Sequence, residues 1–447
     1  MSKLWAQAAT TKKTKKTEAV RRGNFSPGRM RFGALAARRA LFVFACWRNA
    51  RKIRGVTLPN IVHLDADAFF VSCELALKPE LRGTKCAVGG RQRGIISSAS
   101  YEARACGVYT PMPTVSAMRV CPDLIMLPHT AGLYSRVSRQ MFELCETLTP
   151  IVQRNSIDEG YLDVTPCGFG SVAEIERAVR GLQEKIWAKL QVTVSFGMAT
   201  NKLVAQIASK LRKPQGFVTV LPGTEAEFLE PLPIGKLPGV GPKTEETLVK
   251  RHGIKLVRDL LAKSESELRA IFGNGWREMV ACARGVDDRP VETEREDAKS
   301  YSQQETFGEN IGEFAEIERV VKRMIDELLP KIREDGKRVK TMTVKVRYPD
   351  FTHESHGRSL AAASDIEAPF YPLVEPLLRA AWRKKRPLRL VSVRFSSVED
   401  GPAQLEMFAQ TDEKRRRLAS VLDQLNVGGR LAVVQHGHQL AKRRPTR

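Results

Sequence analysis

The order of strands and helices in the middle of the chain limits the folds that it can adopt. When residues 77–127 are set aside as an insertion, apolar periodicity and turn residues predict the order β-α-β-β-α-β. Strands are expected at 60–66, 151–156, 161–164 and 192–197, and helices at 69–76 and 172–190, with one more helix at 133–148. This order is typical of a split βαβ layer, in which helices cover one face of a sheet. We therefore expect an α+β fold.

The same order returns in the last third of the chain. Strands are expected at 301–307, 340–348, 356–360 and 388–396, and helices at 314–333 and 369–382. Within 340–348, apolar side chains alternate with polar ones, among them Lys345 and Arg347, so one sheet face is expected to be basic. Such a face can lie on a phosphate backbone, although ordinary solvent-exposed residues would give the same pattern. Between the two repeats, residues 237–285 are expected to form a small helical region.

The net charge favours nucleic acid as a partner. The 447 residues include 73 Lys and Arg against 50 Asp and Glu, for a net charge of +23, which favours a polyanion over an acidic protein. Residues 1–55 hold 15 basic residues and one acid, Glu18, for a net charge of +14. Residues 56–230 are nearly neutral, with 18 basic and 17 acidic residues. Residues 231–447 carry a net charge of +8, so the basic surface is expected at the two ends of the chain.

The composition also bears on where the protein works. Residues 1–55 are expected to be a disordered basic arm or an upstream extension with a start nearer Met30, although an organelle transit peptide has a similar composition. No apolar run approaches the roughly 20 residues needed to cross a bilayer, so we expect no membrane association. The eight cysteines form no C-x-x-C pair, which fits a reducing compartment such as the cytoplasm.

Acidic residues lie at two points of the first repeat. Asp65 ends an apolar strand and Asp67 follows it, while Asp158 and Glu159 lie in the tight connection between two later strands. These strands are neighbours in a split βαβ sheet, so the acids can converge. Three carboxylates in one place repel one another unless a hard divalent cation lies among them. Two magnesium ions about 3.5–4 Å apart can align an attacking hydroxyl with a phosphoryl group.

Five segments together carry a specific resemblance. Residues 65–70, 100–104, 156–161, Lys213-Pro214 and 238–243 are similar to motifs of the Y-family, or translesion, DNA polymerases, in particular their bacterial branch. The resemblance covers roughly residues 58–410 in the right order. It implies a right-hand polymerase with a ferredoxin-like βαββαβ palm, small fingers, a helical helix-hairpin-helix thumb and a second βαββαβ domain, the little finger.

The resemblance also implies domain boundaries. The expected parts are a basic extension (1–55), palm (56–76 and 128–231), fingers (77–127), thumb (232–290), linker (291–298), little finger (299–398) and a flexible tail (399–447).

In the palm, the resemblance implies a metal-dependent catalytic centre. Asp65, Asp158 and Glu159 match the catalytic carboxylates that bind two Mg²⁺ ions, and the Ala66 carbonyl matches a ligand of the nucleotide-side ion. Asp67 is expected to support these ligands or to position the backbone. One departure is Gly160, where the family commonly has alanine; it adds backbone freedom beside the catalytic pair and removes no ligand.

The resemblance further implies where the incoming dNTP binds. Phe70 matches the steric gate, an aromatic ring that leaves no room for a ribose 2′-hydroxyl. Tyr101, Arg104 and Lys213 match residues that hold the triphosphate, and Ser98 is a weaker hydroxyl donor. Cations and hydroxyl donors around a highly charged anion are electrostatically favourable.

Primer-template DNA and a sliding clamp are the expected macromolecular partners. The glycines of a helix-hairpin-helix let the backbone approach a phosphate, and the helix N-terminus attracts it. The DNA-binding residues expected are Gly239, Gly241, Lys243, Lys345 and Arg347. A short peptide after the last strand resembles the segment with which bacterial polymerases dock on the clamp, with Gln404, Leu405, Met407 and Phe408 as anchors.

The expected function is template-directed, low-fidelity addition of dNTPs to a primer 3′-hydroxyl during translesion synthesis, without proofreading. We expect a cytoplasmic, nucleoid-associated monomer. Two alternatives are open: a catalytically inactive homologue that scaffolds a mutagenesis complex, and another palm enzyme such as a nucleotide cyclase. The intact acids argue against the first, and a cyclase needs neither a helix-hairpin-helix nor a clamp peptide.

Overall fold

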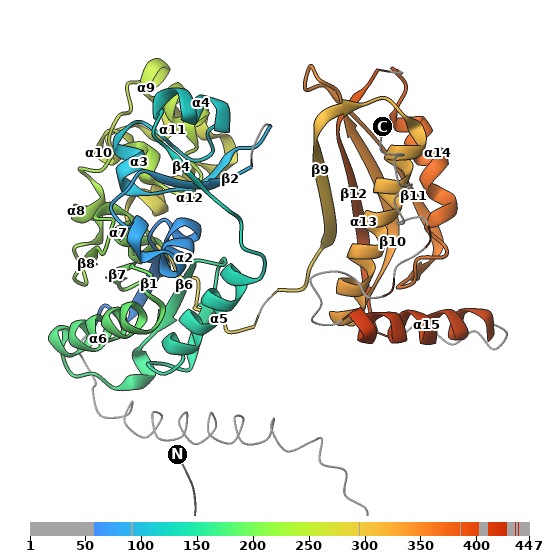
Figure 1. Ribbon diagram of the computed structural model, residues 1–447. Coiled ribbons are helices and arrows are strands. Elements are labelled where there is room, and N and C mark those ends of the chain that lie inside the picture. Colours follow the sequence, from blue (N-terminus) through green and yellow to red (C-terminus); the bar gives the residue numbers. More distant parts are fainter. Residues whose placement is uncertain are drawn as a thin grey trace, which may run out of the picture.

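The computed structural model describes residues 58–90, 93–294, 296–384, 386–401 and 410–426, together with 434 and 437. The basic extension 1–55 and the expected clamp-binding residues Gln404, Leu405, Met407 and Phe408 lie outside the described residues. Among the helices of the described part, none is long and apolar enough to cross a membrane. Figure 1 shows two sheet-containing bodies joined by an extended connection.

The first sheet has the strand order β5-β6-β1-β7-β8. Its central strand β1 (Ile61–Ala66) is antiparallel to both β6 (Glu159–Asp163) and β7 (Val194–Ala199). The strand β5 (Ile151–Arg154) lies at one edge and β8 (Phe217–Thr219) at the other. The β-α-β-β-α-β order is thus confirmed, while β8, only three residues long, was not expected from the sequence.

The two faces of β1 have different roles. Val62, Leu64 and Ala66 are buried in a core that includes apolar residues of three helices, α2 (Phe69–Leu77), α5 (Leu133–Cys145) and α6 (Val172–Leu190). His63 and Asp65 point to the opposite face, where α7 (Lys202–Leu211) packs on β1 and β7. The sequence did not predict α7. This second face therefore combines a packed helix with the acidic end of β1.

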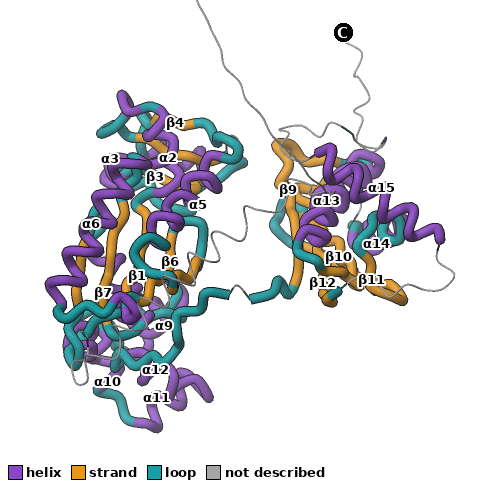
Figure 2. Tube along the Cα trace, turned by 90° about the horizontal axis from the view of Figure 1, so that it is seen from below, coloured by secondary structure: helices purple, strands orange, loops and turns teal. Residues whose placement is uncertain are grey.

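The insertion forms a small unit of its own (Figure 2). Its three-stranded sheet has the order β3-β2-β4, and two short helices complete it: β2 (Cys86–Gly89), β3 (Ile96–Ala99), α3 (Tyr101–Ala105), α4 (Thr114–Val120) and β4 (Ile125–Leu127). A separate apolar core that includes Ile96, Val108 and Leu124 holds this unit together. The insertion thus holds α3 on a small sheet that also packs on the first unit, because Cys86, Val88 and Leu127 belong to the core of the first sheet.

The expected helical region is also present. It consists of α8 (Glu225–Leu229), α9 (Pro242–His252), α10 (Val257–Leu261), α11 (Glu265–Phe272) and α12 (Trp276–Ala283). Its apolar residues share one core with α7, because Leu203 and Val204 lie in the same cluster as Leu248 and Leu260. The helical region is therefore anchored to the first sheet through α7.

The second sheet has the order β11-β10-β12-β9, with α13 and α14 packed against it (Figure 1). Its elements are β9 (Ser300–Ile311), α13 (Phe314–Glu334), β10 (Lys337–Arg347), β11 (His353–Ser364), α14 (Tyr371–Ala381) and β12 (Leu388–Asp400). The alternation expected in β10 is confirmed, since Met342, Val344 and Val346 are fully buried. The second β-α-β-β-α-β repeat and the α+β class follow from these elements.

One helix lies in the stretch expected to be a flexible tail. The helix α15 (Gln410–Asn426) contacts the second sheet's helices through Asp423, whose carboxylate accepts hydrogen bonds at 2.7 and 2.9 Å from the Arg333 guanidinium on α13. Arg416 pairs with Asp365 at 3.2 Å, and Ala419 is buried. Residues 410–426 are thus attached to the second sheet unit.

Candidate active site

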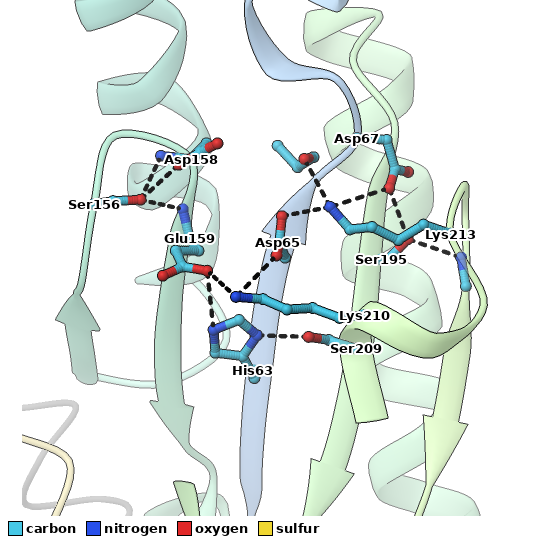
Figure 3. A network of polar contacts seen from close by, with 12 residues as sticks. His63, Asp65, Asp67, Ser156, Asp158, Glu159, Ser195, Ser209, Lys210 and Lys213 are labelled. Atoms are coloured by element: carbon cyan, nitrogen blue, oxygen red, sulfur yellow. Dashed lines mark hydrogen bonds and ion pairs between the residues drawn. The ribbon is translucent and has the colours of Figure 1, made fainter. Parts of the chain in front are cut away.

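The catalytic carboxylates predicted from the sequence lie around the end of β1. Asp65 is the register partner of Glu159 on β6 and of Ser195 on β7. The backbone N–H of Ala66 donates to the carbonyl of Asp158 at 2.9 Å. The strand β6 begins at Glu159, two residues earlier than expected, so Glu159 is held by the sheet while Asp158 remains in the turn. Strand pairing therefore places Asp65 and Glu159 side by side (Figure 3).

Two lysines offset part of the negative charge at this strand end. The Lys213 ammonium lies 2.5 Å from Asp65 Oδ1 and 3.1 Å from the Ala66 carbonyl oxygen. The Lys210 ammonium lies 2.9 Å from Glu159 Oε2 and 3.8 Å from Asp65 Oδ2. The Lys213 ammonium also lies 3.6 Å from Asp67 Oδ1, so it contacts three oxygen atoms on one side of Asp65, while Lys210 contacts two on the other side, as Figure 3 shows.

Asp67 has a supporting position. Its side chain is 1% exposed and accepts hydrogen bonds from Ser195 Oγ and from the Gln215 N–H, both at 2.8 Å. The Ser195 hydroxyl in turn accepts the Gly216 N–H at 2.9 Å. Asp67 thereby ties the end of β1 to β7 and to the loop that carries Lys213, in agreement with the expectation that it positions neighbouring groups.

The structure does not bring the Asp158 carboxylate to the other two. Its Oδ1 accepts a hydrogen bond from Ser156 Oγ at 2.5 Å, on the outer side of the turn (Figure 3). No three His, Cys, Asp or Glu side chains within the described residues lie close enough together to hold a metal ion. The Asp158 side chain must therefore rotate away from Ser156 before it can bind the same metal ion as Asp65.

Burial and charge act in opposite directions on these acids. Burial raises the pKa of the Asp65 carboxyl above its ordinary value, although Lys213 and Lys210 both act to lower it. Burial also acts to raise the pKa of Glu159, but the hydrogen bond and charge of Lys210 outweigh burial and hold this pKa below its ordinary value. Lys210 thus keeps Glu159 ionised.

His63 is a buried side chain that lies next to Glu159. Burial lowers the pKa of His63 to about 3, so the imidazole is neutral. Its Nδ1 lies 2.7 Å from Ser209 Oγ, and its Nε2 lies 3.9 Å from Glu159 Oε2. Because Ser209 Oγ donates to the Gln206 carbonyl, it is placed to accept from a protonated Nδ1. His63 therefore fills space under Glu159 without adding charge.

The donor set at this strand end fits a hard divalent cation. Asp65, Glu159, the nearby Asp158 and the Ala66 carbonyl supply only oxygen donors, which are the ligands that Mg²⁺ prefers. Three carboxylates, those of Asp65, Asp67 and Glu159, face two ammonium groups, so the cluster has room for more positive charge. Its oxygen chemistry and its excess negative charge both favour metal binding.

Phe70 lies on the first turn of α2 and is backed by another aromatic ring. The ring of Tyr134 packs against it with centroids 4.6 Å apart. The Tyr134 hydroxyl donates at 2.8 Å to Glu74, a buried carboxylate that also accepts from the Thr130 N–H and hydroxyl. The ring of Phe70 thus packs against a tyrosine whose own position is fixed by a hydrogen bond to Glu74.

Three of the four residues predicted to bind a triphosphate, Ser98, Tyr101 and Arg104, lie on or beside α3, whereas Lys213 contacts Asp65. Tyr101 begins this helix, and its hydroxyl lies 3.5 Å from Asp67 Oδ1, while the Arg104 guanidinium stacks 4.9 Å from the Tyr101 ring centroid. Burial and the nearby Asp67 raise the pKa of Tyr101, so its hydroxyl stays a proton donor. Ser98 is buried, and its hydroxyl accepts from the Val71 N–H of α2 at 3.5 Å. Tyr101 thus links α3 to the carboxylate site.

The helix-hairpin-helix segment has the expected turn geometry. Gly239 has a φ of +85°, a backbone conformation that favours glycine, and Gly241 is the N-cap of α9. A Cβ on Gly241 would meet no atom within 4 Å, so the backbone there is open to a ligand. Pro242 and the exposed Lys243 follow on the first turn of α9. This helix start is suited to a phosphate.

The second sheet carries the predicted basic residues on its helix-free face. Lys345 and Arg347 alternate with the buried residues of β10, and Arg394 on β12 lies opposite Thr343 on the same face. Arg394 was not singled out from the sequence, because a single arginine in an apolar strand gives no periodic signal. The face therefore has at least three cationic side chains.

Sequence reasoning also missed Lys210, His63, Tyr134 and Glu74. Lys210 lies on the last turn of α7, which the sequence did not predict, and Lys213 follows in the loop after this helix. His63 and Asp65 share a face of β1 because they are two residues apart. Nothing local marks Tyr134 and Glu74, which meet only through tertiary packing of α2 and α5.

A palm-type nucleic acid polymerase is defined by three features together: the acids at the end of β1, the start of helix α9 and the second sheet. Residues 64–210 match the impB/mucB/samB family, residues 222–254 match the IMS family HHH motif, and residues 298–407 match the impB/mucB/samB family C-terminal domain. The chain belongs to this family, the Y-family of DNA polymerases.

Two relatives cover most of the chain. The protein named DNA polymerase IV from Opitutus terrae is 83% identical over 390 residues, which are 87% of this chain and 100% of the relative. DNA polymerase IV from Desulfatibacillum aliphaticivorans is 38% identical over 370 residues, which are 81% of this chain and 92% of the relative.

Solved structures agree with this membership. A Y-family DNA polymerase chimera of Dbh and Dpo4 has a TM-score of 0.67 and 28% identity, covering 76% of this chain and 99% of its own. An insertion ternary complex of Dbh DNA polymerase has a TM-score of 0.56 and 27% identity over 76% of this chain and 99% of its own. Each likeness therefore spans about three quarters of this chain.

Proposed function

We propose that the chain is a template-directed, low-fidelity DNA polymerase of lesion bypass, which adds dNTPs to a primer 3′-hydroxyl. The observation that carries this function is the pairing of Asp65 with Glu159 at the end of the central strand, in a chain of the Y-family. The family as a whole requires a divalent metal. The alternative of an inactive scaffold has no support, because both paired acids are present and positioned.

The proposed metal ligands are Asp65, Asp158, Glu159 and the Ala66 carbonyl, and the proposed metal is Mg²⁺, two ions per site. Bound there, the ions would polarise the α-phosphate and the primer hydroxyl. Asp65 and Glu159 are held by strand pairing, and Asp67 fixes the loop of Lys213. The protein's own contribution is thus to keep oxygen donors aimed at one place before substrate arrives.

The dNTP is proposed to bind between α2 and α3. Tyr101 donates its hydroxyl, Arg104 and Lys213 supply positive charge to the triphosphate, and buried Ser98 holds the first turn of α2 against β3. The ring of Phe70, backed by Tyr134, occupies the space beside the sugar and excludes a 2′-hydroxyl. These roles follow from the positions of the residues around Asp65 and from the family likeness.

Primer-template DNA is proposed to contact two surfaces. The first is the hairpin with Gly239, Gly241 and Lys243, and the second is the open sheet face with Lys345 and Arg347. We assign the first sheet to the palm (56–76 and 128–231), the insertion 77–127 to the fingers and 232–290 to the thumb. Residues 291–298 form the linker, and 299–398 the little finger.

Three further proposals concern the setting of the enzyme. It acts as a monomer on chromosomal DNA in the cytoplasm. Gln404, Leu405, Met407 and Phe408, which lie outside the described residues, dock on the sliding clamp. Pull-down of purified clamp by the full chain, compared with a variant that has all four residues changed to alanine, tests this docking.

Primer extension with the purified chain, Mg²⁺ and dNTPs tests the central proposal. Asp65→Asn and Asp158→Ala are each expected to lower the rate by about a thousandfold, because each removes a carboxylate ligand of the proposed Mg²⁺ ions, which stabilise the negative charge of the transition state. Circular dichroism of both variants controls for folding. A wild-type protein that adds no nucleotide, or variants as active as wild type, would contradict the assignment.

A further inference from the structure

The two lysines of the acidic cluster lie on oxygen pairs that match the proposed metal ligands. Lys213 contacts Asp65 Oδ1 and the Ala66 carbonyl, the pair assigned to the nucleotide-side ion. Lys210 contacts Asp65 Oδ2 and Glu159 Oε2, the pair that remains for the primer-side ion. Both positions are therefore held by protein cations.

We propose that Lys210 is a resident counter-ion of the primer-side metal position, whose ammonium must leave before a divalent cation can bind between Asp65 and Glu159. Lys210 then sets the metal concentration at which the enzyme becomes active. This inference rests on the proposed function, because it takes Asp65 and Glu159 as metal ligands.

The surroundings of Lys210 allow this exchange. Its side chain is 42% exposed and sits on the last turn of α7, so the ammonium can move into solvent without disturbing the core. Glu159 keeps its orientation when Lys210 leaves, because Asn155 Nδ2 donates to its other oxygen at 2.7 Å. Lys213 is less exposed, at 19%, and has three contacts, to Asp65, the Ala66 carbonyl and Asp67, so it is the less mobile of the two lysines.

Charge and coordination favour the divalent ion at sufficient concentration. An ammonium carries one charge and three donors, whereas Mg²⁺ carries two charges and takes six oxygen ligands. Since a partly exposed ion pair contributes little, the expected effect of Lys210 on metal affinity is about two- to fivefold.

The test compares three variants of the full chain. Lys210→Met keeps the length of the side chain and removes its charge, and Lys210→Arg keeps the charge. Arg212→Met is the matched control. It also removes a positive charge near Lys210, but the exposed Arg212 side chain contacts neither Asp65 nor Glu159 in the structure. Free Mn²⁺ is measured by electron paramagnetic resonance without DNA or nucleotide, and primer extension is titrated with Mg²⁺.

Lys210→Met is expected to bind Mn²⁺ two- to fivefold more tightly and to lower the Mg²⁺ midpoint by the same factor, while the other two variants stay near wild type. Equal or weaker Mn²⁺ binding by Lys210→Met would overturn the inference, as would an equal gain in Arg212→Met. If every protein binds Mn²⁺ as expected but none extends a primer, the polymerase assignment fails instead, and the counter-ion role stands.

Discussion

The ring of Phe142 occupies the space in which residue 160 would carry a side chain. A Cβ built on Gly160 would lie 2.7 Å from Phe142 Cε1 and 2.6 Å from the Gln153 carbonyl oxygen. Gly160 does not have a positive φ, so its role is to leave room, rather than to supply the backbone freedom expected from the sequence. The aromatic residue on α5 therefore explains why glycine stands beside Glu159.

Gly160→Ala is expected to destabilise the protein by about 1–3 kcal/mol, because overpacking forces neighbours to shift. Urea unfolding followed by circular dichroism measures the change. Phe142→Leu combined with Gly160→Ala should recover part of the loss, since the ring is one of the two obstacles. Gly181→Ala is the matched control: a Cβ meets nothing within 4 Å on helix α6, so stability should rise by about 0.4–1 kcal/mol. Equal effects of the two glycine substitutions would contradict the steric explanation.

Phe70→Ala is expected to raise ribonucleotide incorporation about tenfold or more, because the ring beside the sugar is lost while Tyr134 remains in place. The ratio of kcat/KM for dATP and ATP in single-nucleotide extension measures the effect. Phe70→Tyr retains the ring and should keep the wild-type ratio. Unchanged sugar selection in Phe70→Ala would remove the steric-gate assignment.

Asp67→Ala is expected to cost about 1–3 kcal/mol of stability, because it leaves the buried Ser195 hydroxyl and the Gln215 N–H without their acceptor. Primer extension should weaken too, since the loop of Lys213 loses its tie to β1. Ser195→Ala removes only one of these donors and should cost less. If Asp67→Ala is as stable as wild type, the carboxylate does not tie β1 to this loop.

Much of the fold could be predicted because its two repeats have strong periodicity. The alternation in β10 and the long amphipathic pattern of α13 gave both elements within three residues of their bounds. Short elements such as β8 carried too few residues for a periodic signal. The helix α7 was missed although its N-cap Asn201 accepts the Val204 N–H, a signal that the sequence contains.

The active site was predicted less completely than the fold. Motif spacing identified Asp65 and Glu159, and strand pairing brings them together. The hydrogen bond that turns Asp158 toward Ser156 depends on a rotamer, which no spacing specifies. The sequence did not predict Lys210 as a site residue, because its partner Glu159 lies on another element. Only the tertiary structure shows that the two side chains meet.

Deletion of residues 1–55 is expected to leave primer extension intact, because the paired acids and both lysines lie in the remaining chain. The same deletion should flatten the salt dependence of DNA binding, since it removes a net charge of +14 from 15 basic residues and one acid. Fluorescence anisotropy with labelled DNA at several salt concentrations measures the slope. Loss of nucleotide addition would show that the extension is part of the enzyme.

Replacing Lys345 and Arg347 together by alanine is expected to weaken DNA binding and to reduce the salt slope by about one for each phosphate that the variant no longer neutralises. Both side chains lie on the helix-free face of the second sheet, so their removal leaves the apolar core beneath β10 unchanged. Lys322→Ala on α13 is the control, because it removes one positive charge that is paired with Glu318 on a helix surface. Anisotropy titrations of wild type and both variants measure the slopes. The change in the salt slope is compared per positive charge removed. If Lys322→Ala changes the slope as much as each substitution of the double variant does, net charge governs DNA binding and this face does not.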